Sequence, residues 1–376
     1  MKMKKLLCTV LTLSFLVSGT AFAGFSASST QFDPNLAQEA LQIAEMCYMP
    51  SMQASLLALS NYRRVGLFNA ERSETDTRHV ATYGIYDRLT ENGQTEVIIA
   101  IRGTGNGEWK LNFELMPSGN FDLPYSENFS LAADDILSTQ QDYLASLVSP
   151  VFLITGHSRG AAVANILGAR LTDRFKPENV FVYTFATPRT VRGEYPAYSN
   201  IFNVVNPADV ITYLPLPQWG FERYGIDVEL PVERASLLDA AKAAYAARTD
   251  CTTDFPMPKG RSEATKQFID TLASLAPQIQ NGFVTRHALN HPGLAEGDEP
   301  GMTAGEFLLN IFDGNLLSNS GSSNALSQMT QEFTQADNDL VPILHALNLL
   351  SEGGNSDWVS AMHMPACYGA WLSAME

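Results

Sequence analysis

Hydrophobic residues recur along this chain with the two periods that distinguish strands from helices. Short β-branched apolar runs, typical of buried strands, alternate with longer segments whose apolar residues are three or four positions apart, as on one face of a helix. The predicted strands are residues 79–86, 95–101, 151–155, 180–185 and 201–205. The predicted helices among them are residues 34–49, 130–148 and 161–171. This alternation predicts an α/β fold with a mostly parallel central sheet flanked by helices.

Local signals set the ends of two of these elements. Asp33 precedes Pro34, so an aspartate cap and a first-turn proline begin the first helix, and Pro50 ends it. The segment between the first two strands ends in Asn92-Gly93, a pair that favours a tight turn. We therefore expect these two strands to form an antiparallel hairpin.

The pattern changes after residue 216. From about residue 231 it is largely helical, with expected helices at 235–247, 262–275, 303–317 and 325–350. We predict that residues 24–216 and 351–376 form the sheet-containing domain and that residues 217–350 form a helical insertion. The insertion either covers the functional site as a cap or packs to one side, and its place between two candidate catalytic residues favours the cap.

Residues 1–23 have the pattern of a secretory signal peptide. Three lysines precede an apolar run at 6–17, and Ala21-Phe22-Ala23 precedes Gly24. The apolar run is short for a bilayer span. We expect cleavage after Ala23, export to the periplasm or the medium, and no stable membrane span in the mature protein.

Composition narrows the range of partners. The chain has 376 residues, 45% of them hydrophobic, and a formal net charge of −16, which becomes −19 without the three leader lysines. This charge argues against nucleic acid and against electrostatic docking on anionic lipid. Cys47, Cys251 and Cys367 allow at most one internal disulfide and one free thiol in the mature chain. We expect neither a metal ion nor a cofactor, and the sequence leaves the oligomeric state open.

The most informative motif is Gly156-His157-Ser158-Arg159-Gly160, which follows the strand 151–155 and opens the helix 161–171. Gly-x-Ser-x-Gly between a strand and a helix is typical of a nucleophile elbow, a sharp turn from which a serine hydroxyl protrudes. The flanking glycines remove Cβ atoms that would crowd the turn. Ser158 is therefore the candidate nucleophile, and an ordinary turn is the alternative.

A serine nucleophile needs a base, and the base needs an acid that holds its tautomer. In hydrolases with such an elbow, the acid and then the histidine follow the serine. Asp209, just after strand 201–205, is the candidate acid, although turn aspartates also commonly bind backbone N–H groups. His345 lies in an apolar stretch and is interpreted as a core residue, whereas His363 lies at a loop-to-helix junction. The histidines in the permitted order are His287, His291, His345 and His363.

An oxyanion hole combines the N–H of the residue after the nucleophile with a donor from a loop after an earlier strand. Arg159 supplies the first of these donors. Thr104 is the candidate for the second, because strand 95–101 runs directly into its loop. Read alone, Gly103-Thr104 is also compatible with an ordinary strand exit.

These motifs together resemble the class 3 lipases, the fungal-type triacylglycerol lipases and their bacterial relatives within the α/β-hydrolase fold. The matching segments are 100–104, Trp109 with Asn112, 155–160, 184–189, 204–209 with Leu214-Pro215, and His363 with Tyr368 and Leu372. The resemblance covers about residues 35–216 and the final helix; the long insertion has no counterpart in the compact fungal members. It implies the roles of nucleophile, acid and base for Ser158, Asp209 and His363. It also implies that the amides of Thr104 and Arg159 form the oxyanion hole.

The chain departs from the fungal pattern at three places. Arg159 stands where those enzymes usually have leucine, and Ala161 stands where they have another glycine. The segment corresponding to their lid, residues 105–115, alternates apolar and polar residues like a strand, which puts interfacial activation in doubt. Trp109 in this segment either lines an acyl groove or belongs to the core. Trp109 and His157 are the candidate substrate-binding residues.

Together, these features predict a secreted serine carboxylic-ester hydrolase. We expect a lipase or esterase that acts on an ester or lipid through an acyl-enzyme. Two alternatives remain: a non-catalytic lipid-binding protein with the hydrolase fold, and a serine peptidase on the same fold. The sequence does not determine acyl-chain length or head group.

Overall fold

The computed structural model describes residues 25, 28–69, 80–103, 125–193, 196–249, 255–256, 259–274, 350 and 357–375. The predicted leader, the segment corresponding to the lid, the expected helix 303–317 and all of the expected helix 325–350 except Leu350 lie outside these residues. So do Cys251 and the histidines at 287, 291 and 345. What the sequence indicates for these segments remains a prediction.

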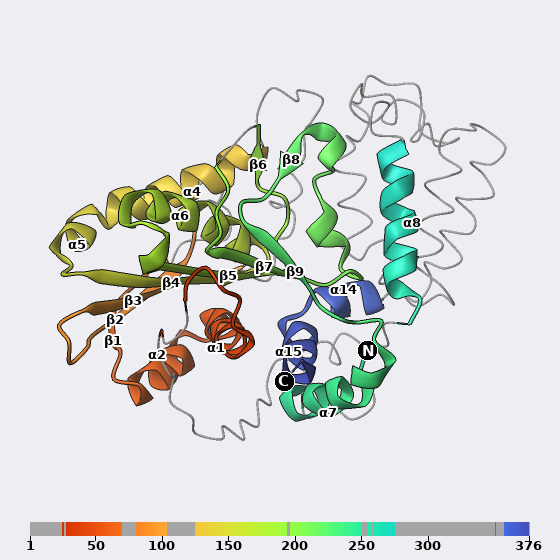
Figure 1. Ribbon diagram of the computed structural model, residues 1–376, viewed down its shortest axis with the longest axis horizontal. Helices are drawn as coiled ribbons and strands as arrows, with labels where there is room; N and C mark the ends of the chain where they lie inside the picture. The colour runs from red at the N-terminus through yellow and green to blue at the C-terminus, as the bar shows by residue number, and fades with distance from the viewer. Residues whose placement is uncertain are drawn as a thin grey trace, which may run out of the picture.

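A seven-stranded sheet forms the centre of the described chain (Figure 1), in the order β1-β2-β3-β4-β5-β7-β9. Its strands are β1 (Arg63–Phe68), β2 (Tyr83–Leu89), β3 (Thr95–Ile101), β4 (Pro150–His157), β5 (Val180–Phe185), β7 (Ile201–Val205) and β9 (Ile226–Glu229). β2 is antiparallel to both β1 and β3, and the pairs from β3 to β9 are parallel. The mostly parallel sheet and the β2–β3 hairpin are confirmed. β6 (Val191–Arg192) and β8 (Phe221–Glu222) form a separate antiparallel ribbon.

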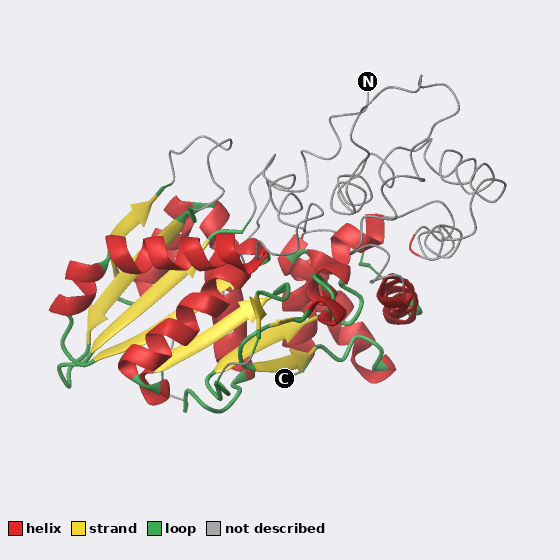
Figure 2. Cartoon of the chain, turned by 90° about the horizontal axis from the view of Figure 1, so that it is seen from above, coloured by secondary structure: helices red, strands yellow, loops and turns green. Residues whose placement is uncertain are grey.

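Helices lie on both faces of this sheet (Figure 2). α1 contacts β4 and β5 on one face, while α6 contacts the same strands from the other and packs against α4. The helices of the first part of the chain are α1 (Pro34–Glu45), η1 (Met46–Tyr48), α2 (Pro50–Leu59), α4 (Tyr125–Thr139), α5 (Gln141–Ser146), α6 (Arg159–Phe175) and η2 (Pro177–Asn179). Those of the later part are η3 (Val210–Tyr213), η4 (Pro217–Trp219), η5 (Ala235–Leu237), α7 (Leu238–Thr249), α8 (Arg261–Ser274), α14 (Asp357–His363) and α15 (Pro365–Ala374).

The first helix begins as its sequence predicts. The Asp33 side chain accepts hydrogen bonds from the N–H groups of Asn35 and Leu36, and proline occupies the first turn. Such a cap satisfies amides that have no partner within the helix. The helix ends earlier than expected, because its last predicted turn is the 3₁₀ segment η1.

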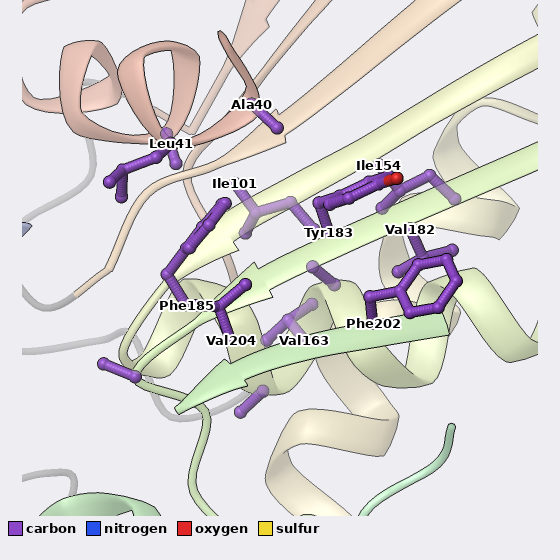
Figure 3. Packing of buried hydrophobic residues seen from close by; sticks show 14 of the residues in the cluster. Ala40, Leu41, Ile101, Ile154, Val163, Val182, Tyr183, Phe185, Phe202 and Val204 are labelled. Atoms are coloured by element: carbon purple, nitrogen blue, oxygen red, sulfur yellow. The ribbon is translucent and has the colours of Figure 1, made fainter. Parts of the chain in front are cut away.

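The core lies between the sheet and these helices (Figure 3). Ala40 and Leu41 of α1 and Val163 of α6 reach the sheet from opposite sides, and all three are buried. The strand side chains between them, such as Ile154 and Phe185, are fully buried as well. Burial of each large apolar side chain contributes about 1.5–3 kcal/mol. This core therefore fixes the ends of β4 and β7, from which the chain turns to Ser158 and Asp209.

The sheet continues beyond residue 216, the predicted end of the first segment of the sheet-containing domain. β9 pairs parallel with β7, and Val204 lies opposite Val228. The sequence pattern did not reveal β9 because it is a short edge strand whose residues are largely exposed. The first helix of the expected insertion, α7, packs directly against α15, the last helix of the sheet domain.

Two cysteines lie in the described part of the chain. Cys47 and Cys367 are buried free thiols, and burial raises the pKa of each to about 12.

None of the described helices has both the length and the apolar character needed to cross a bilayer.

The antiparallel strands β1, β2 and β3 contain two ion pairs with similar geometry, in which both carboxylates are buried but the two arginines differ in exposure. Arg88 donates to Glu96 Oε2 at 2.6 Å, and the Tyr62 hydroxyl donates to the same oxygen at 2.6 Å. Arg63 donates to Asp87, also at 2.6 Å. The Arg63 side chain is 78% exposed, whereas that of Arg88 is 21% exposed.

Replacing each arginine by methionine should separate these two environments. We expect Arg88→Met to lower the free energy of unfolding by about 3 kcal/mol, because it leaves the Glu96 carboxylate buried without its cation. Arg63→Met should lower the free energy of unfolding by less, because solvent screens the exposed Arg63 guanidinium and because Asp87, whose side chain is 6% exposed, keeps the hydrogen bond from the Tyr143 hydroxyl. Urea denaturation of both variants checks this, and equal shifts in the two midpoints would contradict it.

Candidate active site

Ser158 lies at a sharp turn between β4 and α6, as the sequence predicts for a nucleophile elbow. Its backbone has φ 58° and ψ −125°, a conformation that non-glycine residues rarely adopt. Its N–H donates to the Phe185 carbonyl of β5 at 2.9 Å, which ties the turn to the neighbouring strand. The turn therefore projects the serine from the carboxyl end of the sheet.

The glycines of the motif are required by close backbone approach. A Cβ at Gly156 would crowd the carbonyl group of Gly160, and a Cβ at Gly160 would overlap the carbonyl oxygen of Ile101. These contacts allow α6 to begin directly against the ends of β3 and β4. The two departures from the fungal pattern are compatible with this turn, because neither Arg159 nor Ala161 has a positive φ.

Asp209 follows β7 in a turn that its own side chain organises. Its Oδ1 accepts the N–H of Ile211 at 3.0 Å and caps η3, and its backbone N–H donates to the Asn206 carbonyl at 2.8 Å. This is the turn-aspartate role that the sequence left open. Oδ2 points elsewhere, so the residue serves the turn with one oxygen and other partners with the second.

His363 is the last residue of α14, and its ring lies between Ser158 and Asp209. Nδ1 is 2.8 Å from Asp209 Oδ2, and Nε2 is 2.9 Å from Ser158 Oγ. A carboxylate only accepts hydrogen bonds, so Nδ1 carries the proton, and Nε2 of the neutral ring accepts the hydrogen of the serine hydroxyl. The three residues are buried, with 5% or less of each exposed. The arrangement can move a proton from Ser158 to His363 and stabilise the resulting imidazolium.

Tyr368 is a part of this site whose role we did not predict. Its hydroxyl donates to Asp209 Oδ2 at 2.7 Å and accepts the Asn206 N–H at 3.2 Å. Burial and the Asp209 charge raise the pKa of Tyr368 well above its usual range, so the phenol remains a donor. Tyr368 belongs to the motif with His363 that resembles the class 3 lipases, but its spacing from His363 does not reveal a bond to Asp209.

His157, one of the candidate substrate-binding residues, is buried beside His363. Its Nε2 is 2.7 Å from the carbonyl oxygen of His363, and 4% of the residue is exposed. Burial and the neighbouring His363 lower the pKa of His157 to about 3. The His157 side chain therefore contacts the candidate base through the main-chain carbonyl of His363.

Of the two predicted oxyanion-hole residues, Arg159 lies in the described part of the chain and Thr104 does not. Arg159 is the first residue of α6, where a helix amide has no acceptor within the helix. Its side chain points to another segment, because Nη2 donates to the Val80 carbonyl at 3.2 Å. Thr104 and Trp109 lie outside the described residues. Within the described residues, no three His, Cys, Asp or Glu side chains are arranged to hold a metal ion.

Comparison with known proteins gives a family match for the segment that contains Ser158 and Asp209. Residues 98–219 match the family described as Lipase (class 3). The match begins in β3 and ends in η4, so it covers the elbow and the acid turn but not His363. It shows that this segment is similar to the class 3 lipases, and the mostly parallel sheet flanked by helices agrees with the fold class that the resemblance implies.

Solved structures similar to this chain include several fungal lipases. The lipase of Rhizopus microsporus var. chinensis is 16% identical, with 52% of this chain and 74% of that one covered and a TM-score of 0.40. The Rhizomucor miehei lipase propeptide complex is 17% identical, with coverages of 52% and 68% and a TM-score of 0.40. Lipase II of Rhizopus niveus is 16% identical, with coverages of 53% and 82% and a TM-score of 0.39.

The Tyr368 hydroxyl can be tested by a single-atom deletion. We expect Tyr368→Phe to slow labelling of Ser158 by a fluorophosphonate about tenfold, because Asp209 loses a hydrogen bond worth about 1.5–3 kcal/mol. Tyr183→Phe is the matched control, since it removes a tyrosine hydroxyl that accepts the Asp33 N–H at the start of α1. Unchanged labelling of the Tyr368 variant would show that Asp209 does not need this donor.

Proposed function

We propose that this protein, a carboxylic ester hydrolase of the class 3 lipase type, is an exported lipase or esterase that uses Ser158, His363 and Asp209 as its catalytic triad. One observation carries the proposal. The Ser158 hydroxyl, the His363 ring and the Asp209 carboxylate form a continuous chain of buried hydrogen bonds of 2.9 and 2.8 Å. Such a chain is what nucleophilic attack by a serine at neutral pH requires.

The reaction proceeds in two halves. As Ser158 Oγ attacks the ester carbonyl carbon, its proton passes to His363 Nε2, and the carbonyl electrons move to oxygen. The tetrahedral intermediate then breaks its bond to the alcohol, which takes the proton from His363 and leaves an acyl-enzyme. Water attacks this acyl group, gives its proton to His363, and releases the acid while the proton returns to Ser158.

The negative oxygen of each tetrahedral intermediate needs donors. In this proposal the Arg159 amide at the start of α6 is one donor, and its place at a helix N-terminus adds the favourable end of the helix dipole. The second donor is Thr104, after β3. Asp209 stabilises the imidazolium form of His363, and the donors of Ile211 and Tyr368 hold the carboxylate in place.

The decisive test is the nucleophile itself. We expect Ser158→Ala to reduce turnover of a p-nitrophenyl ester by at least about 10⁴-fold, because the acyl-enzyme can no longer form. A fluorophosphonate should label Ser158 in the wild-type protein, and mass spectrometry of the labelled peptide identifies the site. An active Ser158→Ala variant would overturn the assignment.

The same assays separate the alternatives. A non-catalytic lipid-binding protein would remain unlabelled by the fluorophosphonate, and a peptidase would cleave amides as well as matched esters. Once ester hydrolysis is established, a series of esters of increasing acyl length distinguishes a lipase from an esterase for small soluble substrates.

Export is proposed from the leader pattern at residues 1–23. We expect the mature protein to begin at Gly24, because signal peptidase cleaves after small residues such as Ala21 and Ala23. N-terminal sequencing of protein recovered outside the cytoplasm checks this. Ala23→Trp should block the cleavage, and an exported protein that still carries residues 1–23 would contradict the proposal.

A further inference from the structure

The backbone end of α14 is held by side chains from two other segments. The last carbonyl groups of a helix receive no hydrogen bond from within the helix, so their donors come from elsewhere. Asn206 Nδ2 donates to the Met362 carbonyl at 2.9 Å, and His157 Nε2 lies 2.7 Å from the His363 carbonyl. Both side chains are buried, with Asn206 fully enclosed.

These two donors come from the segments that carry the other members of the proposed triad. His157 immediately precedes Ser158 in the elbow, and Asn206 begins the turn that presents Asp209. His157 therefore links the main chain of His363 to the segment of Ser158. Asn206 links the main chain of Met362 to the segment of Asp209. Once the main chain is fixed at both carbonyls, only the two side-chain torsions of His363 remain to be set by its own hydrogen bonds.

We propose that His157 and Asn206 are positioning residues that jointly fix the main chain of His363 relative to Ser158 and Asp209. The inference rests on the proposed function, because it assigns these residues a part in catalysis through the triad. Neither residue touches the reacting atoms.

The chemistry of His157 suits this part. A carbonyl oxygen only accepts, so Nε2 of His157 carries the hydrogen. Nδ1 then bears a lone pair, and it has no hydrogen-bond partner in the described part of the chain. Because the pKa of His157 is lowered to about 3, the ring is a neutral donor at neutral pH. A cation there would oppose the imidazolium of His363, whose ring centre is 5.0 Å away.

Asn206 joins three elements at one point. While its Nδ2 binds α14, its Oδ1 accepts the Ala208 N–H at 3.0 Å and its backbone N–H donates to the Tyr368 hydroxyl of α15. These hydrogen bonds fix the positions of the Asp209 turn, α14 and α15 relative to one another. Misplacement of a catalytic group by about 1 Å costs about 10²-fold in rate, so a loosened frame should be visible in kinetics.

The test compares donor-containing and donor-free residues at position 157. We expect His157→Leu to lower kcat for a p-nitrophenyl ester about tenfold to a hundredfold with little change in KM, because substrate binding is not involved. His157→Gln places an amide donor near the position of Nε2 and should restore most of the rate. The downfield proton resonance of His363 Nδ1–H should shift or broaden in the Leu variant and return in the Gln variant.

Thr155→Val is the matched control. Thr155 also lies in β4, and its buried hydroxyl donates to a helix carbonyl, that of Ala40, at 3.0 Å. The variant therefore loses a hydrogen bond of the same kind without affecting α14, and kcat should stay at the wild-type value. If the Leu variant at position 157 does not fold, His157→Met supplies a second residue without a donor.

The joint action of the two residues is tested with Asn206→Ala and the double variant. Since loss of either donor frees the same segment, the double variant should lose less than the product of the two single losses. A Leu variant with wild-type kcat, a Gln variant as slow as the Leu variant at equal thermal stability, or fully multiplicative losses would each overturn the proposal. A wild-type protein that is inactive and unlabelled would instead count against the proposed function.

Discussion

Asp209 is a carboxylate with 1% of its surface exposed, and a buried charge is stable only where donors surround it. Its donors come from η3, from α14 and from α15, through Ile211, His363 and Tyr368. One charge on the turn after β7 thus holds the two C-terminal helices against the sheet. The position of the His363 ring beside Ser158 is a consequence of satisfying this carboxylate.

The sheet supplies the fixed reference for these contacts. β3, β4, β5 and β7 are parallel neighbours, so their carboxyl ends share one edge of the sheet. The elbow leaves β4 and the acid turn leaves β7, with β5 between them, and the Phe185 carbonyl of β5 accepts the Ser158 N–H. α1 and α6 pack on opposite faces of β4 and β5, and α6 also contacts β7, so packing holds the strand ends that carry the serine and the aspartate in place.

The C-terminal helices are attached to the sheet from several directions. α15 contacts α1 and α7, and α14 contacts both α15 and η3. Asn206 and His157 add hydrogen bonds from the acid turn and the elbow to the end of α14. The helix that carries the proposed base is thus tied to both other segments of the triad. The helix that begins the expected insertion, α7, packs against the same C-terminal unit.

The sequence by itself determined the alternation of strands and helices, the elbow at Ser158 and the aspartate cap of α1, because each depends on neighbours within a few residues. It also narrowed the acid and the base to residues in the right order along the chain. Only the tertiary structure decided that His363 lies against Ser158, since the two are 205 positions apart and their contact depends on how α14 packs. The same holds for the roles of Tyr368, Asn206 and His157 and for β9. Their hydrogen bonds join distant segments, and no local period or spacing encodes such contacts.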